Sequence, residues 1–198
     1  RGLRDVYKRQ QRRRLKLKFE PIEVKDKLNR TIVIRSAIAD DAEDLIKYLK
    51  VTTEETPYLI REPDEVAITH EQEVAFINNC LNSDKSLLLI ATLNGRHIGN
   101  CSLNPIGSYR RYAHRCEVAI ALYQEFCGCG IGRTMLEHML KVATKMGFEQ
   151  AELEVISDNK SAIALYEKLG FKKYGSLPDN MKYASGHYAS ADWMMKKL

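Results

Sequence analysis

The chain has 198 residues, of which 44% are hydrophobic and 29% are charged, and this is enough for one folded domain with a sizeable core. Its 11 glycines and 5 prolines exclude a collagen-like or low-complexity chain, and no apolar run approaches the ~20 residues of a membrane span. The net charge of +5 is uneven: residues 1–18 carry 9 basic and 1 acidic residue, whereas the remaining 180 residues carry 22 basic and 25 acidic ones.

The basic N-terminal segment suits contact with phosphate groups, but its opening also resembles translated adaptor sequence, so whether residues 1–18 are native is left open. No apolar segment follows the basic run, and a secretory signal is therefore not expected. We predict a basic tail over residues 1–30 and a folded domain over residues 31–198. The mildly acidic domain is not expected to bind nucleic acid or a membrane.

The cysteines indicate the cellular compartment. There are five, an odd number, and two of them are only two residues apart, which is typical of reduced thiols in a cytoplasmic protein. Cys127 and Cys129 have no second Cys or His pair nearby, so no metal site is expected.

Short apolar runs that predict strands alternate along the chain with amphipathic runs that predict helices. Strands are expected over residues 31–35, 86–93, 98–103, 116–122, 151–156, 171–174 and 188–195. Helices are expected after Asp40 and Asp41 to about Leu49, and over residues 70–81, 131–146 and 160–169, with residues 52–69 as a loop or broken helix.

Two local signals sharpen this picture. Asn94-Gly95 predicts a tight hairpin between two strands, and Gly170 is placed to end the last helix. The order of elements predicts one α/β domain with a mixed central sheet of about seven strands flanked by helices.

A glycine-rich turn, Cys-Gly-Cys-Gly-Ile-Gly at residues 127–132, joins the strand 116–122 to a helix. Glycines leave backbone N–H groups uncovered, and the helix N-terminus adds positive potential, so this arrangement favours an anion such as a diphosphate. The alternative is structural, because glycines also occur where a helix packs closely on a sheet. Arg133 stands where a Walker A loop needs Lys, and the glycine spacing also differs from the Rossmann fingerprint.

A third pattern fits the loop. Cys127-x-x-Gly130-x-Gly132 resembles motif A of the GNAT acetyltransferase superfamily, Gln/Arg-x-x-Gly-x-Gly/Ala, and residues 159–171 are similar to its motif B. The resemblance covers roughly residues 31–198. Cys127 replaces the usual Gln or Arg, which puts a side-chain contact at this position in doubt.

The resemblance implies acetyl-CoA as co-substrate. The residues that would bind its diphosphate are those of the loop and the helix start: Cys127, Gly128, Cys129, Gly130, Ile131, Gly132 and Arg133. The backbones of Ile120 and Leu122 would pair with the pantetheine arm, and the Leu122 N–H would stabilise the oxyanion. Asn159 would lie beside the pantetheine arm, or it simply caps the helix.

The resemblance also implies Tyr166 as the acid that protonates the departing thiolate, whereas its spacing alone suggests a core aromatic residue. A tyrosine pKa of ~10 lies close to a thiol pKa of ~8.5. Glu117 is the candidate base, because it shares one strand face with two alanines; the alternative is a salt bridge with Arg115. His114 is a weaker candidate for the base.

The acceptor is expected to be a primary amine of a small molecule or amino acid, attacking the thioester directly in a ternary complex. Thr56 and Tyr58 would line its site together with His114, although the first two residues can equally well pack a loop. The C-terminal stretch 182–194 is similar to GNAT enzymes that acetylate free amino acids. The alternatives are a protein N-terminal acetyltransferase and a catalytically silent acyl-CoA-binding module, and a homodimer is left open.

Overall fold

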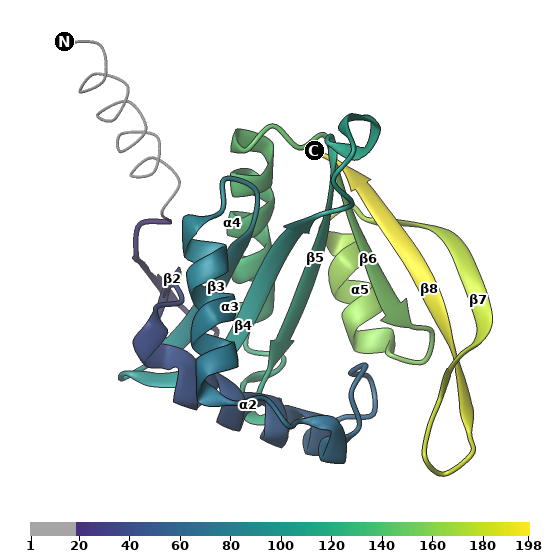
Figure 1. Ribbon diagram of the computed structural model, residues 1–198, viewed down its shortest axis with the longest axis horizontal. Coiled ribbons are helices and arrows are strands. Elements are labelled where there is room, and N and C mark those ends of the chain that lie inside the picture. Colours follow the sequence, from purple (N-terminus) through teal and green to yellow (C-terminus); the bar gives the residue numbers. More distant parts are fainter. Residues whose placement is uncertain (1–18) are drawn as a thin grey trace.

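A computed structural model describes residues 19–198 of the chain (Figure 1). Eight strands form one sheet in the order β1-β2-β3-β4-β5-β6-β8-β7, and all neighbours are antiparallel except β5 and β6. The strands are β1 (Ile22–Lys25), β2 (Thr31–Ser36), β3 (Leu87–Leu93), β4 (Arg96–Pro105), β5 (Arg115–Leu122), β6 (Gln150–Ile156), β7 (Lys172–Lys182) and β8 (Tyr188–Lys197).

Helices cover both faces of the sheet. Helices α2 (Ala42–Glu55) and α3 (His70–Asn82) lie on one face, and α4 (Ile131–Lys145) and α5 (Lys160–Lys168) lie on the other (Figure 1). Strand β3 shows why: Leu88 and Ile90 pack with α2 and α3, whereas the alternating Leu87 and Leu89 join the cluster that contains α4. The predicted single α/β domain with a mixed sheet is confirmed.

Several predicted local features are confirmed. Asn94 and Gly95, with φ of 50° and 82°, form the two-residue turn between β3 and β4. Gly170, with φ of 89°, follows the end of α5. Short 3₁₀ turns complete the chain: η1 (Ala39–Asp41), η2 (Pro63–Glu65), η3 (Arg110–Tyr112) and η4 (Gln124–Phe126).

Helix α2 is longer than predicted. It continues to Glu55, although the sequence suggested a loop or broken helix from residue 52. The two threonines that obscured its period are buried, and their hydroxyls donate to backbone carbonyls one turn back: Thr52 to Tyr48 at 2.8 Å and Thr53 to Leu49 at 2.9 Å. These bonds satisfy the buried hydroxyls and let the helix continue.

The two ends of the sheet also differ from the prediction. Strand β1 lies inside the segment 1–30 that the sequence assigns to a tail, so the sheet begins before residue 31 and has eight strands. Strand β7 continues to Lys182, far beyond the predicted end at residue 174. Its length was not predicted because register shifts on either side of Leu177 and the positive φ of Asp179 interrupt the alternation of side chains. The predicted basic run at residues 1–18 lies outside the described residues.

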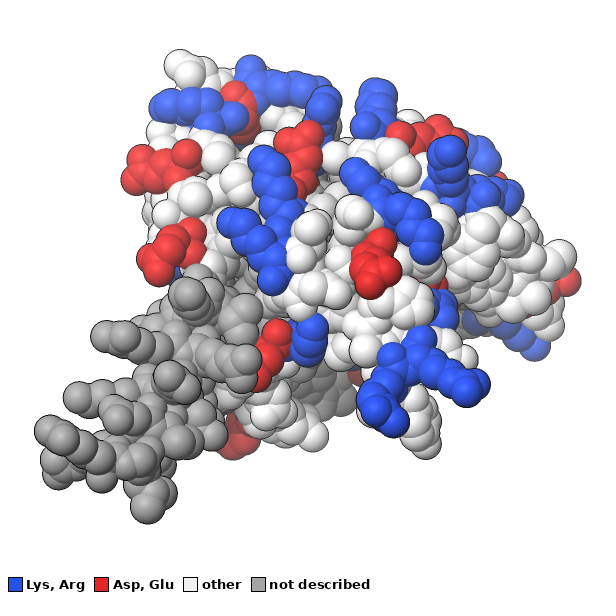
Figure 2. Space-filling model, turned by 90° about the horizontal axis from the view of Figure 1, so that it is seen from above, with Lys and Arg blue, Asp and Glu red and all other residues white. Residues whose placement is uncertain are grey.

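The charged surface is mixed. Figure 2 looks at the end of the sheet where β5 and β6 begin, and Lys and Arg side chains there are interspersed with Asp and Glu. The expectation that the folded domain does not bind nucleic acid stays a prediction. None of the helices within residues 19–198 has the length and apolar character needed to cross a membrane.

Candidate active site

The parallel strands β5 and β6 separate after three residue pairs. Arg115 pairs with Gln150, Cys116 with Ala151 and Glu117 with Glu152, and beyond this point β5 is paired only with β4. Figure 1 shows the two strands diverging toward their carboxyl ends. Beyond the third pair the two strands therefore leave a gap in the hydrogen bonding of the sheet, with unpaired backbone groups on the edges that face each other.

The backbone of β5 shows which residues border this gap. Tyr123 N donates to Ile98 O at 3.1 Å, and Arg115 O accepts from Ile106 N at 3.2 Å, so odd-numbered residues of β5 direct their backbone groups toward β4. Backbone groups of successive residues in a strand point to opposite edges. The N–H and C=O groups of Ile120 and Leu122 therefore face the gap, as predicted for residues that pair with an extended ligand.

The glycine-rich turn follows β5 after the short 3₁₀ turn η4. Gly128 and Gly130 have φ of 76° and 90°, and Gly130 is the N-cap of α4, with no side chain capping the helix. Within the described part of the chain, no acceptor takes the backbone N–H groups of residues 128–133. Six consecutive free donors at a helix N-terminus form a site suited to a diphosphate.

Gly132 explains the close approach of α4 to β5. A Cβ atom at this position would lie 3.4 Å from Leu122 Cδ1 and 3.5 Å from Ile120 Cδ1. The close packing expected from the glycines is therefore present at Gly132, and it brings the helix N-terminus beside the open edge of β5. Anion binding by the loop stays a prediction.

The side chains of the turn take little part in the predicted anion site. Ile131 is buried in the core, and Arg133 pairs with Glu137 at 2.8 Å on the surface of α4. Cys127 is exposed and Cys129 half-buried, and both are free thiols. Cys129, Ile131 and Arg133 offer free backbone N–H groups to a diphosphate, whereas the Cys127 N–H donates to Gln124 O at 3.0 Å, which does not support the predicted contact of Cys127.

Tyr166 occupies α5 with its ring in the core. The residue is 7% exposed and lies against Phe171, with ring centroids 6.0 Å apart. Burial raises the pKa of Tyr166 to about 12, higher than the ordinary value assumed from the sequence. Its hydroxyl takes part in none of the side-chain hydrogen bonds among residues 19–198, and it is not one of the fully buried polar atoms that lack a partner, so a ligand could reach it.

Asn159 is the N-cap of α5, and its side chain accepts a hydrogen bond from Ala162 N at 3.1 Å. The capping role is confirmed. A contact between Asn159 and the pantetheine arm stays a prediction.

The carboxylates near the gap are arranged differently from the prediction. Arg115 forms its ion pair with Glu152, donating from Nη2 to Oε2 at 2.7 Å, and not with Glu117. The hydrogen bond from Arg115 lowers the pKa of Glu152. Glu117 is exposed at the point where the strands separate, on the face opposite the buried Val118.

Sequence reasoning missed Glu154. The parallel register, extended by two residues beyond the Glu117–Glu152 pair, places Glu154 level with Ala119 and across the gap from it. Its exposed carboxylate accepts a hydrogen bond from Asn180 Nδ2 at 2.7 Å. The sequence of β6 alternates acidic and apolar residues, and this pattern by itself indicates a strand and not the position of Glu154 beside the gap.

The predicted base and the predicted oxyanion donor lie far apart along β5. Glu117 and Leu122 are five residues apart, which corresponds to roughly 17 Å along a strand. This is too long for one water molecule to connect a base at Glu117 with an acetyl group held at Leu122. Ile120 is two residues closer, and its N–H group also faces the gap.

His114 is not near the loop. It precedes β5, and its carbonyl accepts hydrogen bonds from Glu149 N at 2.8 Å and Gln150 N at 3.1 Å. Its position at the opposite end of β5 from the glycine-rich turn does not support the predicted contact with the acceptor or the alternative role as base. Its backbone instead stabilises the start of the β5–β6 pairing.

Thr56 and Tyr58 belong to the α2–α3 loop, which contacts the tip of the β7–β8 hairpin. The Tyr183 hydroxyl donates to Pro57 O at 2.8 Å, and Ala184 N donates to Glu62 Oε1 at 3.0 Å. Burial raises the pKa of Tyr183, and Tyr58 and Asp158 contribute to this rise from nearby. Ile156, the last residue of β6, pairs with Ala191, so the hairpin tip and its contact with the α2–α3 loop lie beyond the carboxyl end of β6.

Three comparisons place the chain among known proteins. The model of the acetyltransferase (GNAT) family matches residues 48–171. An N-alpha-acetyltransferase of Saccharolobus solfataricus is 31% identical over 170 residues, which cover 85% of this chain and 92% of that protein.

Solved structures agree in fold. A GNAT-family acetyltransferase from Streptococcus pneumoniae has a TM-score of 0.81 and 27% identity, covering 84% of this chain and 99% of that one. An acetyltransferase from Salmonella typhimurium, solved with its cofactor acetyl-CoA, has a TM-score of 0.75 and 20% identity, covering 84% of this chain and 94% of that one. With the family model matching more than half of its length, this chain belongs to the GNAT acetyltransferase family.

Proposed function

We propose that this enzyme transfers the acetyl group of acetyl-CoA to the α-amine at the N-terminus of a polypeptide. The observation that carries the choice of acceptor is the likeness to the Saccharolobus solfataricus N-alpha-acetyltransferase, which covers 85% of this chain and 92% of that protein. The free small amine or amino acid expected from the sequence is the competing acceptor.

Acetyl-CoA is the co-substrate, and it supplies the acetyl group on an activated thioester. The free N–H groups of residues 128–133 suit its diphosphate, and the open edge formed by Ile120 and Leu122 suits the amides of its pantetheine arm. Both sites consist of backbone, so the replacement of the usual Gln or Arg by Cys127 does not remove a required donor.

We assign the oxyanion donor to Ile120 rather than to Leu122. A backbone N–H that is already fixed by the strand needs no rearrangement when negative charge develops on the thioester oxygen. Ile120 lies within one residue of the level of Glu154, whereas Leu122 lies closer to the diphosphate loop. Leu122 then binds the pantetheine arm.

The proton of the attacking amine passes to Glu154, with Glu117 as the alternative base nearer the strand junction. A peptide α-amine of pKa ~8 costs about 1.4 kcal/mol to deprotonate at pH 7, whereas a lysine amine of pKa ~10.4 costs about 4.6 kcal/mol. A single exposed carboxylate, acting through water, is better matched to the α-amine. This difference also supports an N-terminal acceptor over a lysine side chain.

Tyr166 donates the proton to the departing thiolate from its free hydroxyl. Because burial raises its pKa to about 12, the hydroxyl remains protonated throughout the neutral range and is always available as a donor. The same shift makes the complete transfer of its proton less favourable than the ordinary tyrosine pKa would. The tyrosine is then reprotonated from solvent or from the released amine proton.

Exposed apolar side chains of the α2–α3 loop and the β7–β8 hairpin, called the rim below, support a polypeptide acceptor. Ile60 of the α2–α3 loop is 82% exposed and Tyr58 is 37% exposed, and the hairpin residue Tyr188 is 46% exposed. Apolar side chains exposed next to an active site are typical of surfaces that contact a larger partner. Such a rim would hold the first residues of a peptide while its α-amine enters the gap.

The test is thiol release from acetyl-CoA in the presence of two matched acceptor sets: short peptides with free N-termini, and the corresponding free amino acids and simple amines. Release on peptides but not on the same peptides with blocked N-termini is expected. Turnover restricted to free amino acids would replace the peptide acceptor with the small-molecule one. Binding of acetyl-CoA without release on any amine would favour a catalytically silent module.

A further inference from the structure

The turn between β1 and β2 lies directly against the glycine-rich turn. Lys27 N donates to Cys129 O at 3.0 Å, and Lys27 Nζ donates to Gly128 O at 3.0 Å. A Cβ atom on Gly130 would lie 3.5 Å from Lys27 Cγ. One residue, about one hundred positions earlier in the chain, therefore contacts three consecutive residues of the loop.

These contacts orient the loop donors. In a planar trans peptide the C=O and the N–H point in opposite directions. Lys27 holds the carbonyls of Gly128 and Cys129, so the N–H groups that share those peptide units, on Cys129 and Gly130, point away from Lys27. Neither N–H has an acceptor within the described part of the chain.

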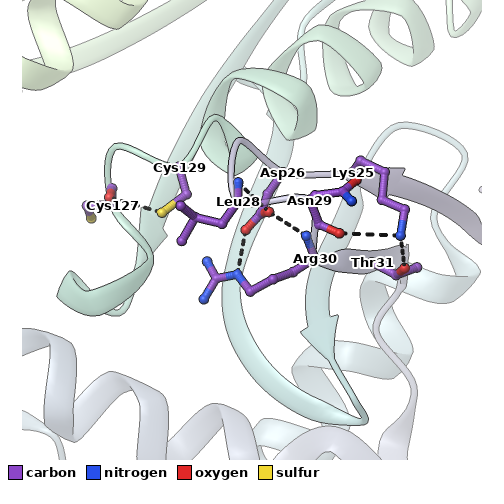
Figure 3. Close-up of polar contacts among 8 residues, drawn as sticks. All are labelled: Lys25, Asp26, Leu28, Asn29, Arg30, Thr31, Cys127 and Cys129. Atoms are coloured by element: carbon purple, nitrogen blue, oxygen red, sulfur yellow. Dashed lines mark hydrogen bonds and ion pairs between the residues drawn. The ribbon is translucent and has the colours of Figure 1, made fainter.

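The β1–β2 turn is itself held by several hydrogen bonds, which Figure 3 shows. The buried Asp26 carboxylate accepts hydrogen bonds from Leu28 N at 2.9 Å, Arg30 N at 2.8 Å and Arg30 Nε at 2.7 Å. Asn29 N closes the turn by donating to Asp26 O at 3.0 Å. Lys27 is thus presented from a turn whose backbone is held by these hydrogen bonds.

We propose that Lys27 is a positioning residue for the diphosphate of acetyl-CoA, which fixes the Gly128 and Cys129 peptide units so that their N–H groups face the phosphates. The proposal rests on the proposed binding of acetyl-CoA at this loop. It assigns a function to strand β1, which otherwise only extends the edge of the sheet.

Lys25 provides a matched control. It lies on the same hairpin and is also exposed, but its ammonium donates to Thr31 Oγ1 at 2.6 Å and does not contact the glycine-rich turn (Figure 3). Lys27→Met removes the ammonium contact and keeps the backbone one. Lys27→Pro removes both donors at the second position of the turn, a position that proline tolerates. Lys27→Arg retains a cationic donor.

The experiment is calorimetric titration of each variant with CoA and with dephospho-CoA, which keeps the diphosphate, together with steady-state kinetics. We expect Lys27→Met to weaken the binding of both ligands about 5- to 10-fold, the loss of one hydrogen bond, and Lys27→Pro to weaken it further. For Lys27→Met, KM for acetyl-CoA should rise by the same factor while kcat stays unchanged. Lys27→Arg should recover most of the affinity for both ligands. Lys25→Met should bind them as the wild type does.

Equal CoA affinities of Lys27→Met, Lys25→Met and the wild type would overturn the proposal. A loss seen with CoA but absent with dephospho-CoA would also overturn it, because Lys27 would then bind the 3′-phosphate and not position the diphosphate loop. Failure of the wild-type protein to bind CoA at all would instead contradict the proposed function. The two failures are therefore distinguishable.

Discussion

Glu117 and Glu152 lie directly opposite one another in the last residue pair that joins β5 and β6. Like charges in this position destabilise a strand pair, and Arg115 compensates by forming its ion pair with Glu152. The strands separate immediately beyond this pair. The Glu117–Glu152 pair therefore marks the point where β5 and β6 stop pairing. Beyond it, the edge of β5 that faces β6 has free backbone groups.

Replacement of Tyr166 by Phe should lower kcat about 100-fold, because it removes the hydroxyl that protonates the thiolate and keeps the ring in the core. KM for acetyl-CoA and the melting temperature should change little. Steady-state kinetics and thermal unfolding of the same preparation provide the measurement. An unchanged kcat would show that Tyr166 is only a core residue.

Tyr166 should also affect the stability of the protein at alkaline pH. Its pKa is about 12 in the folded state and ~10 in the unfolded state. The contribution of its protonated hydroxyl to the free energy of unfolding is therefore fully present below pH 10 and is lost as the pH rises toward 12. Urea unfolding of the wild type and of Tyr166→Phe at pH 9 and pH 11 should show the larger loss of stability for the wild type.

Glu154→Gln should lower kcat about 100-fold, and Glu117→Gln should have the smaller effect, because Glu154 lies closer to the level of Ile120. Both side chains are exposed, so neither variant should unfold. Kinetics with a peptide acceptor at a saturating concentration of acetyl-CoA will rank them. The reverse order would restore Glu117 as the base.

Gly130→Ala should destabilise the protein by about 1 kcal/mol and also weaken the binding of acetyl-CoA, because φ at this position is 90°. Gly95→Ala is the control: it has similar strain, with φ of 82°, but lies in the β3–β4 turn with open space around it. Comparable losses of melting temperature are expected, with a rise in Kd for acetyl-CoA only for Gly130→Ala. A rise in both would mean that strain alone affects binding.

Asp192 should stabilise the C-terminal part of the sheet. Burial alone would raise its pKa, but hydrogen bonds from Lys173, Ser176 and Ser157 lower it to about 2. Asp192→Asn should therefore lower the melting temperature by about 3–6 °C at pH 7. Since a lowered pKa stabilises the fold above the unfolded value of ~3.9, the difference between wild type and variant should shrink as the pH falls from 4 to 2.

The local chemistry of the sequence was sufficient to predict most of the fold. Asn94-Gly95 specifies its turn, and the glycine-rich segment specifies both a helix start and an open set of donors, because these are effects of neighbouring residues. Strand β1 was missed because two half-buried residues in a four-residue strand form too short a pattern.

The site was less predictable, since it depends on where two strands stop pairing. Nothing in the residues of β5 or β6 alone sets the length of their contact, and so the position of Glu154 across from Ala119 was not apparent from the sequence. The docking of Lys27 on the glycine-rich turn joins segments about one hundred residues apart, and no local pattern records it.

The open side of β5 has a consequence for the protein without its co-substrate. An unpaired strand edge is a template onto which other chains can add, and natural proteins usually cover such edges or shield them with charge. In the proposed complex the cover would be a small molecule, because the pantetheine arm would take the place that a neighbouring strand would occupy. Acetyl-CoA would thus serve this enzyme both as reactant and as protection against self-association.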